Sequence, residues 1–155
     1  MSDLQTLDQR DRSTLQRPSS ALRPFVISPD SMPTAAGTYA YPLGVADAPG
    51  LILDRVFAVT GTLLEFDGTN YYTFKPWVVR KAPAGTLDKV FVGTPRSTLA
   101  TSIRAAEAFR VHDEHALKVA LLDGYPFGVD VVVTGTPASA QILVKPTFQA
   151  SVYIR

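Results

Sequence analysis

The only two histidines of the chain, His112 and His115, bracket two carboxylates, Asp113 and Glu114. Residues three apart share one face of a helix, so imidazole nitrogens and a carboxylate oxygen there would suit a divalent metal ion. Helical zinc sites favour the HExxH spacing, which this segment lacks, and no third ligand is identifiable elsewhere. We therefore interpret the segment as a solvated charged turn and expect neither a metal nor a cofactor.

Other catalytic chemistry finds little support in the residue types. The chain has no cysteine and no serine in a G-x-S-x-G elbow. Glu65 and Asp67 form an acidic pair, but a carboxylate in an Asp-Gly context is typical of a turn. Residues 93–98 could receive an anion at the start of a helix, helped by Arg96, but they lack the Gly-Lys pair of a phosphate-binding loop. The sequence predicts a protein that is not an enzyme.

An aromatic and basic run over residues 71–81 is the strongest candidate for a functional surface. Strand alternation places Tyr71, Lys75 and Trp77 on one face. That face can stack on sugars or unpaired bases, form a protein interface, or pack as core beside a solvated edge. Because Pro76 has no amide hydrogen to donate, we expect an edge strand or a bulge there.

The elements that would position these residues form a body over residues 51–155. The predicted fold is α+β and mainly β, a compact antiparallel domain with one or two short helices. Asp67-Gly68-Thr69 predicts a hairpin turn between two of the strands. In the first strand, Arg55 interrupts an apolar face. The predicted strands cover residues 51–60, 62–66, 70–81, 86–92, 129–134, 141–144 and 147–154.

A helix is predicted to begin with Thr94 as its N-cap and Pro95 in its first turn. The apolar residues that follow recur at helical spacing and form one amphipathic stripe, namely Leu99, Ile103, Ala106 and Phe109. Residues 111–123 leave two alternatives open. They fit a second helix ending at Gly124, or a strand that enters a turn at Asp123-Gly124.

Residues 1–50 have a different composition and predict an extended N-terminal arm. Six of the twelve prolines of the chain fall there, at Pro18, Pro24, Pro29, Pro33, Pro42 and Pro49. Such a segment cannot bury its own apolar surface, so it is either a tail without fixed structure or an arm held by a neighbouring subunit. Its two apolar patches, around Phe25 and Tyr39, can each add as an edge strand to another chain.

The overall composition excludes several partners. The net charge of +1 gives no electrostatic footprint for nucleic acid or an anionic membrane. No run approaches the roughly 18 apolar residues of a membrane span, and no signal peptide is recognisable. Charged residues are 19% of the chain, below the usual level of about 25%, which favours a surface that is partly covered by other subunits.

With a proline-rich leading arm, a cysteine-free β body and late strands rich in Ala, Thr, Gly and Val, the chain resembles the virion structural proteins of tailed phages, in particular capsid-decorating or cement proteins. The resemblance implies a homo-oligomer that binds the major capsid protein or other virion subunits and is assembled into the virion in the host cytoplasm. The alternative is a carbohydrate- or surface-binding β module of a phage tail or adhesin. The candidate partner-binding residues are Phe25, Val26, Ile27, Tyr39, Tyr41, Tyr71 and Trp77.

Overall fold

The structure, a computed structural model, describes residues 22–59, 64–100, 102–103, 108–110, 118–138 and 147–154. These residues are mainly β and contain no helix. One antiparallel sheet has the strand order β1 (Arg23–Ile27), β12 (Thr147–Ile154), β3 (Leu51–Val59) and β10 (Val119–Ala120), and β9 (Ala108–Arg110) also pairs with β3. The other has the order β2 (Gly37–Val45), β11 (Pro126–Thr134), β5 (Tyr71–Lys81) and β6 (Leu87–Phe91), and β7 (Arg96–Ser97) also pairs with β5. A short ribbon joins β4 (Leu64–Glu65) to β8 (Ser102–Ile103).

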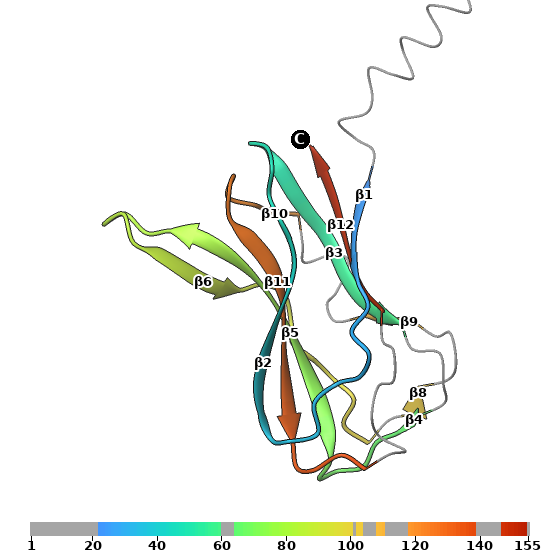
Figure 1. Cartoon of the computed structure of the whole chain (residues 1–155). Coiled ribbons are helices and arrows are strands. Elements are labelled where there is room, and N and C mark those ends of the chain that lie inside the picture. Colours follow the sequence, from blue (N-terminus) through green and yellow to red (C-terminus); the bar gives the residue numbers. More distant parts are fainter. Residues whose placement is uncertain are drawn as a thin grey trace, which may run out of the picture.

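The two sheets pack face to face around one apolar core (Figure 1). Alternate residues of each long strand point inward, as the period of two requires. Phe148 of the first sheet lies between two aromatic rings of the second, 5.6 Å from Tyr41 and 6.0 Å from Phe74 between ring centroids. Other fully buried side chains are Leu51, Leu53, Val56, Tyr72, Val78, Phe127 and Val129. Each such side chain stabilises the sandwich by roughly 1.5–3 kcal/mol of apolar burial.

The connectivity is that of a jelly roll. Eight strands form its framework in chain order: β1, β2, β3, β5, β6, β10, β11 and β12. When these eight strands are numbered 1 to 8 in chain order, one sheet has the strand order 1-8-3-6 and the other sheet has the order 2-7-4-5. This alternation between sheets is the double Greek key of jelly-roll proteins, an architecture used by viral capsid proteins, lectins and cupins.

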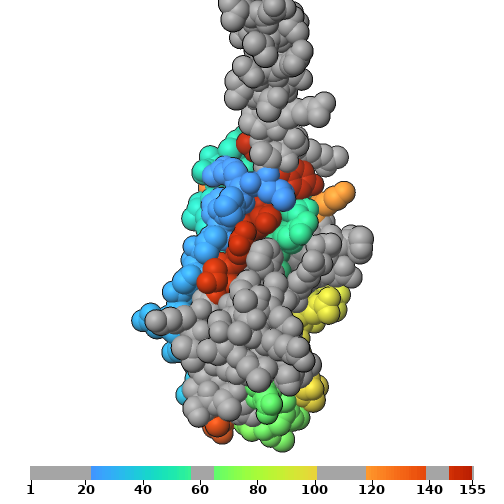
Figure 2. All heavy atoms as spheres, turned by 90° about the vertical axis from the view of Figure 1, so that its right-hand side faces the viewer, coloured from blue at the N-terminus to red at the C-terminus, as the bar shows by residue number. Residues whose placement is uncertain are grey.

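The predicted N-terminal arm is corrected for residues 22–50, because they belong to the sandwich. β1 pairs with β12 along its whole length, and β2 pairs with β11. The two strands are edge strands, as the apolar patches predicted, but they add to sheets of their own chain. Figure 2 shows β1 in blue beside β12 in red, with β3 beyond. Residues 1–21 lie outside the described part of the chain.

A β-bulge explains the charged residue that interrupts the first predicted strand face. Ser151 of β12 pairs with Arg55, whereas the next residue, Val152, pairs with Leu53. Asp54 is therefore an extra residue in β3, and the strand changes face at this point. The core receives Leu51, Leu53 and Val56, while Arg55 stays outside it.

The predicted helix after Thr94 is wrong for the residues that the structure describes. Residues 96–97 form β7, which pairs with Thr73 and Phe74. Thr98 is fully buried, and its hydroxyl accepts a hydrogen bond from the amide of Tyr72 at 2.9 Å. Ala100 then adopts a left-handed conformation with φ of 50°, which no α-helix accommodates. Pairing with β5 outweighs the helical spacing of apolar residues in a segment rich in β-branched threonine.

The predicted hairpin around Asp67 is also corrected. The turn exists, because the Asp67 carboxylate accepts hydrogen bonds from the amides of Thr69 and Asn70 at 2.8 and 2.6 Å. The strand before it, however, pairs with β8 and not with β5. The hydrogen bonds of Asp67 determine where the chain turns, but they do not determine which strands pair with each other. Of the two alternatives for residues 111–123, the strand entering a turn at Asp123-Gly124 is the one observed over the described residues 118–124.

Candidate functional site

The β5–β6 hairpin reaches away from the two packed sheets (Figure 1). Its turn closes through Ala82, whose amide donates to the Thr86 carbonyl at 2.8 Å, and Gly85 supplies a left-handed φ of 89°. This confirms the strand predicted over residues 86–92. Leu87 and Phe91 on β6 keep 46% and 50% of their surface exposed. The hairpin therefore presents apolar side chains outside the core.

Pro76 marks the place where β5 changes its neighbour. β5 is not an edge strand, because β11 pairs with it on one side and β6 and β7 on the other. Pairing with β6 covers β5 from Trp77 onward, and pairing with β7 covers Thr73 and Phe74. The Pro76 carbonyl accepts from the Val92 amide at 2.9 Å, so the missing N–H would have faced the gap between β6 and β7. The predicted edge strand or bulge at Pro76 is therefore wrong, because β5 has partners on both sides and its pairing shows no register shift there.

An ion pair anchors the hairpin to the body. The Lys89 ammonium on β6 lies 2.5 and 2.6 Å from the two carboxylate oxygens of Asp130 on β11, and thus spans the intervening strand β5. Asp130 is only 3% exposed, although its side chain lies on the outer face of the sheet. An unpaired carboxylate at such a position would be costly, so the ammonium group balances its burial.

The Lys89 stem covers Trp77. The ammonium nitrogen lies 4.7 Å from the centre of the indole ring and 5.6 Å from the ring of Phe91. The indole also lies next to Gly128, its register partner on β11, where an added Cβ atom would approach the ring to 3.0 Å. Trp77 is consequently 5% exposed. It faces outward, as the alternation predicted, but as placed here it does not offer a free ring face for a sugar or a base.

Of the three predicted anchors at residues 25–27, two pack against the core and one faces outward. The Phe25 ring lies edge-on to Phe127, with 5.1 Å between centroids, and Ile27 packs beside it. Val26 points the other way and is 51% exposed. The Arg23 guanidinium forms a bidentate ion pair with the Asp47 carboxylate, with nitrogen–oxygen distances of 3.0 and 3.1 Å. This pair links β1 to the loop after β2. This hydrogen bond lowers the pKa of the Asp47 carboxyl.

The three predicted tyrosines are partly buried and pack against the core. Tyr39 donates its hydroxyl to the Ala35 carbonyl at 2.9 Å. Tyr41 stacks on Phe148, and desolvation raises the pKa of its phenol. Tyr71 lies at the start of β5, far along the strand from the hairpin tip. The structure therefore does not gather Tyr71 and Trp77 into one exposed platform.

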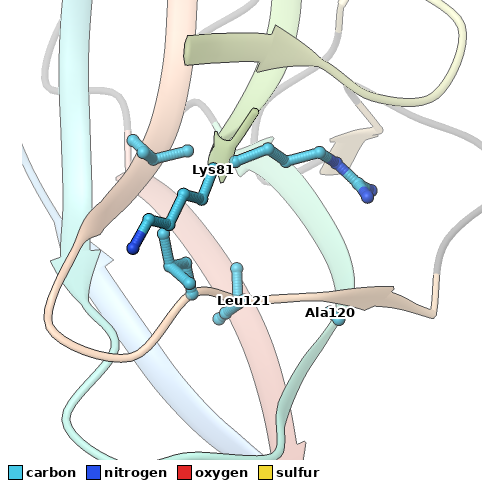
Figure 3. A pocket seen from close by; sticks show the side chains of 6 residues that line it. Lys81, Ala120 and Leu121 are labelled. Atoms are coloured by element: carbon cyan, nitrogen blue, oxygen red, sulfur yellow. The ribbon is translucent and has the colours of Figure 1, made fainter. Parts of the chain in front are cut away.

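An open hollow of about 270 Å³ lies between the hairpin and the loop around β10 (Figure 3). Its lining residues are Val79, Arg80, Lys81, Ala120, Leu121 and Leu122. It lies just below the volume range of small-molecule sites, and its only ionisable groups are two cations. A second open hollow is lined by Leu22, Asp54, Arg55, Lys118 and Tyr153. The lining of the first hollow contains no carboxylate, histidine or hydroxyl side chain.

Other predicted chemistry has separate outcomes. Within the described residues, no group of three or more His, Asp or Glu side chains could hold a metal ion, and His112 and His115 lie outside those residues. Asp67 acts in a turn, as expected. The proposed anion position at residues 93–98 has no helix to support it. Across the same described ranges, no helix has the length and hydropathy to cross a membrane.

The sequence analysis did not identify four residues of this hairpin and its anchor. They are the exposed Leu87 and Phe91 and the paired Lys89 and Asp130. One signal was visible, since Asp130 interrupts an otherwise apolar run in Val129-Asp130-Val131-Val132-Val133. A charge inside such a run demands a partner. The identity of the partner, Lys89, depends on the strand order and could not be read from spacing.

These features define a class: a jelly-roll β-sandwich with an apolar hairpin that projects beyond its core. Comparison with protein-family models, with curated proteins and with solved structures found no match to the chain.

Proposed function

We propose that the protein is a structural component of a virion, which binds and stabilises a capsid or another viral assembly by contacts between β surfaces. It would be incorporated into the particle in the host cytoplasm, next to a major capsid protein or other virion subunits. The observation that carries the proposal is a hairpin that projects from a jelly roll and keeps Leu87 and Phe91 about half exposed among the residues that the structure describes.

Two further properties support an assembly function. Jelly rolls build many viral shells, although the fold alone does not determine a function. The low share of charged residues, 19%, also suits a protein whose surface is largely covered in its working state.

The experiment is to measure the mass of the purified full chain in solution and to identify what it captures from infected or producing cells. We expect concentration-dependent association and capture of a component of a much larger particle. A protein that stays monomeric at all concentrations and captures no particle component would contradict the proposal.

The alternative, a carbohydrate-binding module, has less support. Its predicted platform depended on Trp77, which is only 5% exposed and has the Lys89 ammonium group over its ring. A glycan array with the wild type and with Trp77→Ala tests it directly. Binding to a defined glycan that is lost in Trp77→Ala, while assembly is retained, would favour the module over the virion component.

A further inference from the structure

Among the described edge strands of five or more residues, β6 is the one that contains no proline. Natural sheets protect their edges with proline, bulges, short strands or charged side chains. β1 contains Pro24, and β2 contains Pro42 together with a register shift opposite residues 127–128. β10 has only two residues, whereas β6 has five and no proline.

The hydrogen-bond pattern shows which backbone groups of β6 are free to pair. The Val92 amide donates to Pro76, and the Ala82 amide donates to Thr86 at the other end of the hairpin. Hydrogen-bonded pairs alternate along an antiparallel ladder, so Asp88 and Val90 direct their amides and carbonyls toward β5. The main-chain groups of the other β6 residues point to the free edge. These residues are Leu87, Lys89 and Phe91.

The same three residues are spaced for pairing with themselves. In an antiparallel arrangement about a two-fold axis at Lys89, Leu87 of one copy lies opposite Phe91 of the second copy, and the contact occurs twice. Phe91 is the register partner of Trp77 within its own sheet. Leu87 would therefore extend an apolar row that already contains Phe91 and Trp77 of the second copy.

β6 carries two charged residues, Asp88 and Lys89. Lys89 lies on the same face as Leu87 and Phe91, and the structure turns its charge away from the edge. Its ammonium group is drawn back over β5 to Asp130, with the Trp77 ring beneath it. The two Lys89 ammonium groups therefore do not face each other at the two-fold axis, because each is paired with Asp130 of its own copy. Asp130, two strands away from the edge, thus holds the Lys89 ammonium group away from it.

We infer that the edge of β6 is a contact between two copies of this chain. An antiparallel β6–β6 pair would join the sheet that contains β2, β11, β5 and β6 in one copy to the same sheet in the second copy. The inference deepens the proposed function and rests on it. Strands of five residues bury far less than a standard interface, so one contact is weak and suits an assembly in which many contacts act together. Lys75 and Lys81 of the two copies add some repulsion, so salt should strengthen the association.

Three variants of the full chain test the contact by sedimentation over a wide concentration range. Leu87→Lys should weaken association about tenfold, because it replaces two symmetric apolar pairs by charges at the edge. Asp130→Asn should weaken it as well, since Lys89 is then released toward the edge. Adding Lys89→Met to Asp130→Asn should restore association, because no charge remains to be released. Val26→Lys on the edge of β1 is the matched control and should have no effect.

Thermal unfolding of each variant shows whether its fold is retained. A loss of association in Leu87→Lys and Asp130→Asn with rescue in the double variant supports the contact. If Leu87→Lys self-associates as strongly as the wild type does, the β6–β6 contact is refuted, but the proposed assembly function is not. A wild type that is monomeric yet captures a particle component has the same meaning. A monomeric wild type that captures nothing overturns both.

Discussion

Phe25→Ala distinguishes a strand that belongs to the sandwich from an arm that belongs to a neighbour. Truncating a buried Phe to Ala typically costs 3–5 kcal/mol. Phe25 packs edge-on against Phe127 and lies so close to Gly44 that a Cβ there would approach one ring carbon to 2.4 Å. Because the ring remains partly exposed, we expect a loss of about 2–3 kcal/mol in the free energy of unfolding. For a chain of 155 residues this corresponds to a fall in Tm of about 5–10 °C.

The measurement is thermal and urea unfolding by circular dichroism at a concentration where the protein is monomeric. Val26→Ala is the matched control, since Val26 lies on the same strand but is 51% exposed, and its free energy of unfolding should change by less than about 0.5 kcal/mol. If Phe25→Ala leaves the unfolding midpoint of the monomer unchanged and weakens only its association, residues 23–27 act as an arm after all, and the position of β1 in the sandwich is refuted.

Further predictions concern the backbone, the turn and the pH dependence. Gly128→Ala should destabilise the fold by about 2 kcal/mol or more, because its Cβ would lie 2.3 Å from the Tyr41 carbonyl oxygen; Gly68→Ala, with open space around it, should change the urea midpoint little. Asp67→Ala should cost about 1 kcal/mol by calorimetry, since it removes the acceptor of two amide hydrogen bonds. Burial raises the pKa of Tyr72 to about 12. The folded state therefore favours the neutral phenol, and its contribution to the free energy of unfolding is complete below pH 10. Between pH 10 and 12 this contribution is lost at up to about 1.4 kcal/mol per pH unit. Urea titrations at several pH values should show a smaller slope for Tyr72→Phe.

The long strands were predictable because alternation and β-branched composition are local properties. The pattern of residues 71–81 gave both the strand and its two faces correctly, and residues 147–154 were also assigned. Pairing was not predictable to the same extent. The turn at Asp67 bends the chain without joining its two flanking strands to each other, since β4 pairs instead with β8. Turn chemistry is determined within four residues, whereas strand partners depend on the whole sandwich.

The two larger errors have a common physical origin. Proline-rich composition predicted an arm, yet Pro24 and Pro42 lie on edge strands, where a missing amide hydrogen costs little. Helical spacing after Thr94 predicted an amphipathic helix, yet the threonine hydroxyl at position 98 is buried against β5. In both segments the residues pair with a strand of a sheet that would otherwise have an unpaired edge, and this tertiary pairing outweighed the local preference.

The Lys89–Asp130 pair links the stability of the hairpin to the exposure of its edge. Replacing a buried ion pair with apolar residues is often neutral, so stability alone does not require charges at these positions. A lysine held in place by a carboxylate can, however, do what an apolar side chain cannot: it leaves the edge uncharged while the pair is intact and protects it when the pair is broken. Asp130→Asn and the double variant with Lys89→Met should therefore have similar unfolding midpoints but opposite association. If the two variants instead lose stability and association in parallel, the pair only holds the hairpin, and the edge must be controlled by other residues.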